Sequence, residues 1–229
     1  MLGLRDVWTT YAEERMKASA HWAEAPVTIR GEQVERVTAF PYLGSILGED
    51  SVGKELSARL RKAGDVFAVL KPHVWKRRDL TLRLKLRLFN SAVMSSLCYG
   101  IETWPIHDRH LRRLEAFHCM CLRTITRMPR LERTTNQAVL QKAGTCPLRD
   151  TARLRRLRWF GHVRRMPLER WPRKMLGAVI GGRKRSGGQR VTWENLVQRD
   201  CKTLGIADSW NLSLDRAAWK KACRPQAHS

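Results

Sequence analysis

The amino-acid sequence predicts a mainly α-helical protein with a small β hairpin near its start. Two observations lead to this fold class. After Ser51, apolar residues recur at three- and four-residue steps over most of the chain, which is the period of an amphipathic helix. Before Ser51, two short β-branched runs flank a glycine, which is typical of a hairpin. We therefore expect a helical domain over 51–127 and a second, basic helical domain over 128–229.

The hairpin region is predicted over 27–50. Val27 to Ile29 and Val34 to Val37 are its expected strands, and Arg30 to Gln33 form the turn between them. An aromatic run, Phe40 to Ser45, follows the hairpin and is interrupted by Pro and Gly. Residues 1–26 carry scattered apolar residues without a clear cap, so this segment is left unassigned.

Two helices are expected next. Ser51 is placed to cap an amphipathic helix that ends before Pro72. From Leu80 to Leu88, leucines alternate with polar residues, which alone would favour a strand. We predict a helix capped by Asp79, because the apolar spacing beyond Leu88 is helical and because Leu, Arg and Lys form helices better than strands.

The remaining helices are predicted from helix-capping residues and from the Pro and Gly residues that end helices. Helices are predicted from Asp108 to Ile125, from Thr135 to Ala143 with Gly144 as a stop, and from Pro147 to near Pro167. Met175 to Ile180 is expected to be a short strand, and 181–190 a flexible basic loop. The last predicted helices are Thr192 to Leu204 and Ser213 to Ala222. The break around Met128 to Arg133, which contains Pro129, is the predicted domain boundary.

Charge is the strongest functional signal. The chain has 44 Lys and Arg against 21 Asp and Glu, a formal net charge of +23. Such a surplus indicates a polyanionic partner, first nucleic acid and second an anionic membrane surface. The longest stretch without charge has 14 residues, which is too short to span a bilayer. With no signal-peptide core and no paired cysteine motif, we expect an intracellular protein of the nucleus or cytoplasm, with no membrane partner and no small-molecule substrate.

The positive charge is concentrated in 151–190. This stretch holds thirteen basic residues and one acid, Glu169, and it interleaves aromatic rings with guanidinium groups from Arg155 to Arg165. Arginine binds phosphate in a fork, and Arg and Trp both stack on bases. The alternative is a solvated basic face with Trp159 and Phe160 in the core. The candidate nucleic-acid-binding residues of the chain are Arg59, Lys62, Arg155, Arg156, Arg158, Trp159, Arg164, Arg165, Arg183, Lys184, Arg185 and Arg190.

No catalytic site is predicted. The sequence has no Asp-Asp pair, no P-loop and no dinucleotide-binding, zinc-protease or serine-hydrolase motif. His118, Cys119, Cys121, Cys146 and His162 are possible soft metal ligands, but no pair has the spacing of a closed zinc site. We therefore expect no bound metal and no cofactor.

Seven short strings, in chain order, resemble one family. Together they look like the C-terminal part of reverse transcriptases encoded by LINE-type non-LTR retrotransposons, many of which also carry an endonuclease. The strings are Tyr42 to Ser45, Leu56 to Ala63, Tyr99 to Trp104, Phe117 to Arg123, Leu157 to Met166, Gly187 to Trp193 and Asp215 to Trp219.

The resemblance implies a helical thumb over 51–127, preceded by the last palm strands and followed by a segment that holds RNA. In such enzymes a Tyr-x-Asp-Asp turn of the palm holds Mg²⁺, and no such turn is found here. We therefore expect an RNA- or hybrid-binding fragment of an RNA-directed DNA polymerase that is inactive alone. Two alternatives are a host-used (domesticated) nucleic-acid-binding module and an endonuclease tail, although the latter needs clustered carboxylates. The expected thumb cations are Arg59, Arg61, Lys62, Arg83, Lys85 and Arg87.

Overall fold

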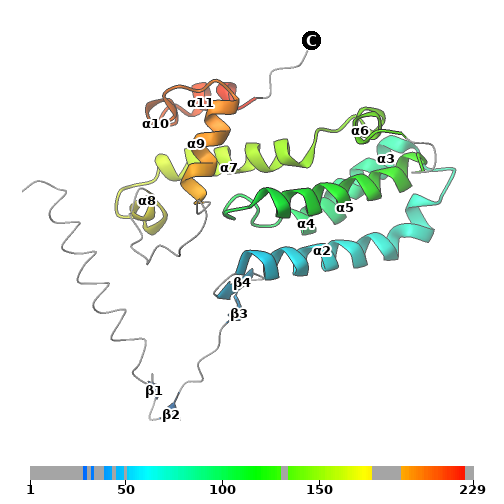
Figure 1. The fold of residues 1–229 in the computed structure, drawn as a ribbon, viewed down its shortest axis with the longest axis horizontal. Coiled ribbons are helices and arrows are strands. Elements are labelled where there is room, and N and C mark those ends of the chain that lie inside the picture. The colour runs from blue at the N-terminus through cyan, green and yellow to red at the C-terminus, as the bar shows by residue number, and fades with distance from the viewer. Residues whose placement is uncertain are drawn as a thin grey trace, which may run out of the picture.

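A computed structural model describes residues 28–29, 32–33, 39–42, 45–48, 51–129, 134–176 and 192–224. These residues fold mainly into α helices, which confirms the predicted fold class. Residues 51–143 form a helical bundle, and a long helix over 148–164 runs from this bundle to a smaller group of C-terminal helices (Figure 1).

The β structure consists of two short antiparallel pairs. Strand β1 (Thr28–Ile29) pairs with β2 (Glu32–Gln33), and β3 (Ala39–Tyr42) pairs with β4 (Ser45–Gly48). The second strand of the predicted hairpin is therefore misplaced, because β2 falls inside the expected turn. Two residues separate the strands of each pair, and connections of this length are the commonest in hairpins. Val34 to Val37 lie outside the described residues.

Helix α2 (Ser51–Leu70) forms where the sequence predicts it. Leu56, Ala63 and Phe67 are buried on one face, as the three- and four-residue spacing requires. A π-helical turn, η1 (Lys71–Trp75), follows with a proline in its first turn. The Trp75 indole donates a hydrogen bond to the Phe67 carbonyl at 2.9 Å and stacks on the Phe67 ring at 5.2 Å, which folds the end of this segment back onto α2.

The ambiguous leucine-rich stretch is helical. It comprises α3 (Leu82–Leu88), the π-helical segment η2 (Phe89–Met94) and the short α4 (Ser95–Leu97). The predicted cap is wrong, because Thr81 caps α3 by accepting a hydrogen bond from the Leu84 N–H at 3.3 Å. Asp79 instead forms an ion pair with Arg77.

Helix α5 (Asp108–Thr126) crosses the bundle and ends at Arg127, whose φ of 56° is left-handed. Helix α6 (Asn136–Ala143) begins and ends as predicted, with a Thr135 side-chain cap and Gly144 at φ 58°. The Arg123 guanidinium donates to the Thr134 carbonyl at 2.7 Å, which fixes the start of α6 against α5.

The C-terminal part begins with α7 (Leu148–Arg164) and continues through α8 (Trp171–Met175), α9 (Trp193–Thr203), α10 (Ser209–Leu212) and α11 (Arg216–Ala222). The prediction of a strand from Met175 is wrong at its start, because Met175 is the last residue of α8; 177–180 lie outside the described residues. Predicted helices at Thr192 and Ser213 are confirmed as α9 and, in shortened form, α11. Asp215 caps α11 by accepting two backbone hydrogen bonds at 2.8 and 3.1 Å.

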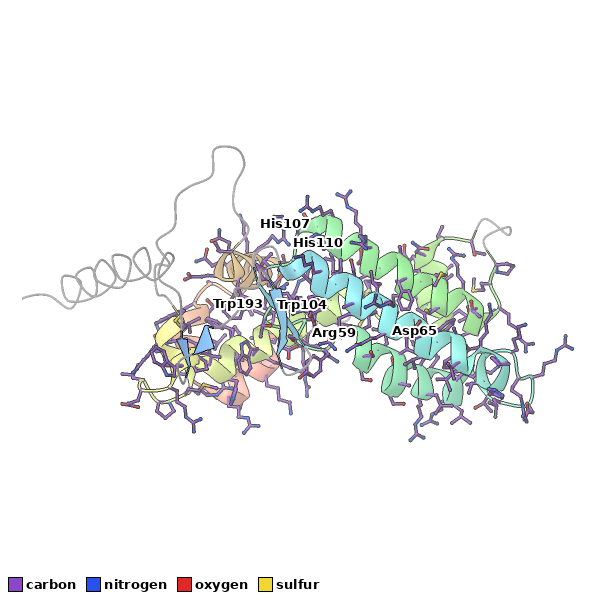
Figure 2. The ribbon with its side chains drawn as sticks, turned by 90° about the horizontal axis from the view of Figure 1, so that it is seen from below. Arg59, Asp65, Trp104, His107, His110 and Trp193 are labelled. Atoms are coloured by element: carbon purple, nitrogen blue, oxygen red, sulfur yellow. The ribbon has the colours of Figure 1, made fainter. Side chains whose placement is uncertain are left out.

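The described residues form two hydrophobic cores, and the boundary between these cores lies within α7. The first lies among α2 to α6 and includes Leu148 and Ala152 from the start of α7. The second joins Leu157 and Phe160 of α7 to α9 and α11. The start of α9 also lies against the turn before α5, because the Trp193 indole donates to the Glu102 carbonyl at 2.7 Å (Figure 2). A domain boundary at Met128 to Arg133 stays a prediction, and the change of core lies further along the chain.

Candidate nucleic-acid interface

Arg156 lies in a buried ion pair between α7 and α9. Its Nε donates to one Asp200 carboxylate oxygen at 2.7 Å, and Arg153 Nε lies 3.6 Å from the other oxygen. Arg156 and Asp200 are both buried. A buried charge needs a partner, and each of these residues supplies it to the other. Arg156 therefore holds two helices together and is not available to phosphate.

The end of α7 is fixed to α10 and the residue after it by two further predicted arginines. Arg164 donates to the Trp210 carbonyl at 2.8 Å, and its guanidinium carbon lies 3.6 Å from the centre of the Trp210 ring. Arg165 donates to the Ser213 carbonyl at 2.6 Å. Arg164 is buried, whereas Arg165 is partly exposed. Both therefore have structural partners, and only Arg165 also reaches the surface.

Arg155 and Arg158 lie on other faces of α7. Arg155 donates to the Cys98 carbonyl at 2.8 Å and so ties α7 to the residue that follows α4. Arg158 is exposed and makes no hydrogen bond or ion pair with any residue that the structure describes. Of the four predicted arginines in α7, Arg158 is the one whose surroundings fit a phosphate contact without rearrangement.

The predicted aromatic pair separates in the structure. Phe160 is buried in the second core, as the alternative interpretation expects. Trp159 is only partly buried, and its ring centre lies 5.5 Å from that of exposed His162. Trp159 therefore keeps a partly open ring.

Arg59 and Lys62 both belong to α2 but differ in exposure to solvent. Arg59 is 6% exposed, with its Nε donating to Glu55 at 2.7 Å and its guanidinium 4.4 Å from the Tyr99 ring centre (Figure 2). Glu55 also accepts a hydrogen bond from the Ile46 N–H at 2.7 Å, which ties β4 to α2. Arg59 thus has a structural role, whereas Lys62 is exposed.

Lys85, one of the thumb cations, is buried rather than exposed. Its ammonium group donates to the Trp75 carbonyl at 3.2 Å and also to the Arg77 carbonyl. Burial lowers its pKa from the ordinary value. Lys85 therefore fixes the end of η1 against α3 and cannot meet a nucleic acid.

The structure places two exposed tryptophans where sequence reasoning singled out none. Trp171 of α8 is 63% exposed, and Trp210 of α10 is 45% exposed. The Arg173 guanidinium lies 5.6 Å from the Trp210 ring centre, and the Lys174 ammonium lies 5.3 Å from that of Trp171. We call the group made of Trp171, Arg173, Lys174 and Trp210 the Trp–Arg surface; buried Arg164 lies beneath the Trp210 ring. The string Arg170 to Lys174, which alternates cations with an aromatic ring, was the available signal.

The Trp–Arg surface has the chemistry of a single-strand platform. The guanidinium of buried Arg164 lies over the Trp210 ring, and Trp210 nevertheless stays 45% exposed. Bases stack on aromatic rings regardless of sequence, and neighbouring cations attract the phosphates. Arg183, Lys184, Arg185 and Arg190 belong to the segment that joins α8 to α9 and lie outside the described residues.

Two of the possible metal ligands, His118 and Cys121, are buried in α5. Burial lowers the pKa of His118 to about 4 and raises the pKa of the Cys121 thiol to about 12. Within the described ranges, no three His, Cys, Asp or Glu side chains come together in a group that could hold a metal ion. The expectation of no bound zinc stays a prediction.

No family model matches the chain, and comparisons with curated proteins and with solved structures also give no match. The resemblance to LINE-type reverse transcriptases therefore rests on the seven sequence strings. Among the described helices, none is both long and apolar enough to cross a membrane.

Proposed function

We propose that this chain binds RNA or an RNA–DNA hybrid, as the thumb and C-terminal part of a LINE-type reverse transcriptase, without polymerase activity of its own. The observation that supports this most is the Trp–Arg surface. Two exposed indoles, each within 6 Å of a cation, offer stacking and charge together. A surface that served solubility alone would not need exposed tryptophan, the largest apolar side chain.

The net charge of the chain supports the same partner. The sequence carries +23, and the segment between α8 and α9 adds four predicted phosphate-binding residues to the neighbourhood of α8 in the sequence. In the bundle, Arg61, Lys62, Arg83 and Arg87 are exposed and make no hydrogen bond or ion pair with residues that the structure describes. They fit the role of thumb cations that contact a duplex backbone.

The lack of polymerase activity follows from the sequence. A nucleotidyl transferase needs paired carboxylates to hold its metal ions, and this sequence contains no Asp-Asp pair. We expect purified protein to extend no primer with Mg²⁺ or Mn²⁺. Template-dependent extension above a mock preparation would contradict this part of the proposal.

Binding of single-stranded RNA by the variant Trp171→Ala tests the Trp–Arg surface. If a base stacks on this ring, the variant should bind about 1–3 kcal/mol more weakly. Leu168→Ala is the control, because Leu168 is an apolar residue near α8 in the sequence and is 69% exposed. Equal affinities of both variants and the wild type would exclude Trp171 from the interface.

A charge-matched pair of variants tests the cations. Arg173→Ala combined with Lys174→Ala should weaken RNA binding, whereas Lys71→Ala combined with Lys76→Ala should leave it nearly unchanged. The second pair removes the same charge from the turn after α2, at the far end of the bundle from α8 (Figure 1). An equal loss of RNA affinity in the two double variants would mean that net charge, and not this surface, drives binding.

A further inference from the structure

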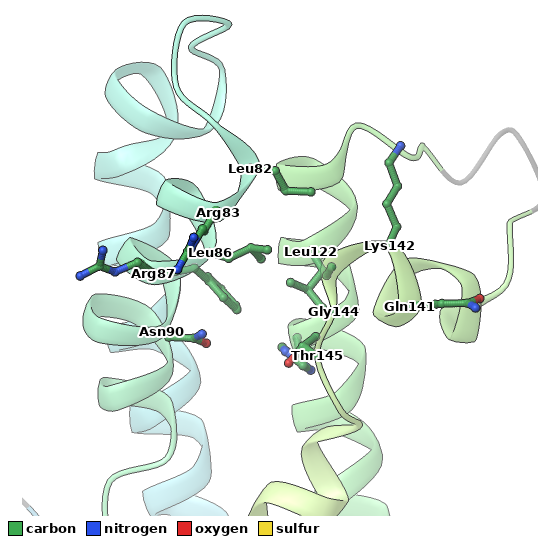
Figure 3. Close-up of a pocket in the computed structure, with 13 residues that line it drawn as sticks. Leu82, Arg83, Leu86, Arg87, Asn90, Leu122, Gln141, Lys142, Gly144 and Thr145 are labelled. Carbon is green, nitrogen blue, oxygen red and sulfur yellow. The ribbon is translucent and has the colours of Figure 1, made fainter. Parts of the chain in front are cut away.

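A groove in the helical bundle lies outside the Trp–Arg surface. It has a volume of about 450 Å³ and lies between α3 and η2 on one side and α5 and the end of α6 on the other (Figure 3). Figure 3 shows Leu82 and Leu86 from α3 directed toward Leu122 of α5 across this space. Sites for small organic ligands have volumes of this size. Apolar and polar residues share the lining of this groove in similar measure.

One buried polar side chain that lines the groove has no hydrogen-bond partner among the residues that the structure describes. His118 is 4% exposed and lies parallel to Phe89, with ring centres 5.9 Å apart. No hydrogen bond joins its ring to any residue that the structure describes. Burial lowers the His118 pKa to about 4, so at neutral pH the ring has one donor and one acceptor nitrogen. Such a group is expected to find a partner, and the groove is where one can enter.

The rim of the groove is positively charged. Arg83, Arg87 and Lys142 line it, all exposed, and none makes an ion pair with a described residue. Figure 3 shows the Arg87 guanidinium extending outward, while Asn90 points into the space. No Asp or Glu is among the lining residues. The groove therefore combines leucine side chains, the His118 imidazole and a cationic rim.

We propose that this groove binds one unstacked nucleotide, with the base between Leu86 and Leu122 and its edge toward His118 and Asn90. The phosphates on either side of the nucleotide lie at Arg83 and at Lys142, which Figure 3 shows on opposite sides of the groove. A flat heterocycle suits the leucines that line the groove, its edge supplies donors and acceptors for the imidazole and amide, and the phosphates complement the cationic rim. The nucleotide belongs to a bound strand, so this inference rests on the proposed function.

The test uses the full chain and single-stranded RNA that carries one 2-aminopurine, a base whose fluorescence rises when it leaves the stack. Saturation with wild-type protein should raise this fluorescence. Arg83→Glu combined with Lys142→Glu should abolish the rise, whereas Lys71→Glu combined with Lys76→Glu, a matched pair outside the groove, should preserve it. His118→Phe keeps the ring and its stacking on Phe89 but removes both nitrogens, and should weaken binding about fivefold.

The outcomes separate the two proposals. If wild-type protein fails to bind RNA, the proposed function is wrong. If it binds RNA but the fluorescence stays constant and the groove variants match their controls, the groove assignment alone is overturned. Titration with AMP and CMP tests whether the groove also binds free nucleotides. If wild-type protein binds AMP or CMP saturably and the Arg83, Lys142 double variant does not, the nucleotide site is supported, but its ligand is a free nucleotide and not part of a strand.

Discussion

Arg156 and Arg158 lie two positions apart on α7 and meet opposite surroundings. Arg156 is enclosed between α7 and α9 with Asp200, whereas Arg158 is exposed. Both belong to one basic run in the sequence, and nothing in their local spacing distinguishes them. A substitution therefore has very different effects at the two positions.

Arg156→Met should lower the free energy of unfolding by about 3 kcal/mol, because it leaves the Asp200 carboxylate buried with only the longer contact to Arg153. Adding Asp200→Leu should restore most of the loss, since the site then holds no unpaired charge. Arg158→Met is the control and should change stability by less than about 0.5 kcal/mol. Chemical denaturation measures all three, and equal effects at Arg156 and Arg158 would contradict the buried pair.

His118 makes stability depend on pH. Burial lowers its pKa from 6.5 to about 4, so the unfolded chain binds this proton more readily than the folded chain. The contribution of neutral His118 to the free energy of unfolding is complete above pH 6.5 and is lost as the pH falls to about 4. The total loss over this window is about 3 kcal/mol. The difference in unfolding free energy between wild type and His118→Phe should change over this window. A difference that stays constant with pH would contradict a buried neutral imidazole.

The packing of α7 against α11 depends on a small residue at one helical position. At Gly161 a β carbon would lie 2.5 Å from Trp219 Cδ1 and 3.1 Å from Arg165 Nη1. The Trp219 indole is held there by a 2.9 Å hydrogen bond to the Leu157 carbonyl. The two helices therefore approach closely because residue 161 has no side chain.

Gly161→Ala should destabilise the protein by about 1–3 kcal/mol, since Trp219 must move and the gain in helix propensity is smaller. Gly64→Ala in α2 is the matched control. Its β carbon would meet only Phe117 at 3.9 Å, so this variant should be stabilised by about 0.5–1 kcal/mol. Thermal unfolding of both variants checks that their stability changes have opposite signs. Equal destabilisation would contradict the close approach of α7 and α11 at Gly161.

At the scale of the whole molecule, charge is spread over both helical groups. Several arginines and Lys85 are occupied by internal contacts, so only part of the 44 Lys and Arg side chains can contact a ligand directly. The exposed cations of α2, α3 and α8 remain. Binding should therefore be electrostatic in origin while involving only part of the net charge.

If about six to eight cations contact phosphates, log K should fall with log salt at a slope of roughly −4 to −7. Replacing Arg183, Lys184 and Arg185 by Ala should flatten this slope by about two. Titrations of RNA at several salt concentrations measure it. Binding that survives both this triple substitution and half-molar salt would mean that the basic segment is not the nucleic-acid site.

The sequence by itself determined the fold class, most helix positions and the sign of the charge. These properties depend on neighbours along the chain: apolar periodicity, caps such as Thr135 and Thr192, and a stop at Gly144. The local signal was insufficient at Asp79, where Thr81 caps the helix instead.

Tertiary structure decided which cations are free. The partner of Arg156 is 44 positions away and that of Arg155 is 57 positions away, so no local pattern distinguishes them from an exposed arginine. The Trp–Arg surface and the groove at His118 likewise arise because separate helices meet. Burial and pairing are properties of the packed chain, and they assign each charged side chain to the interior or to a ligand.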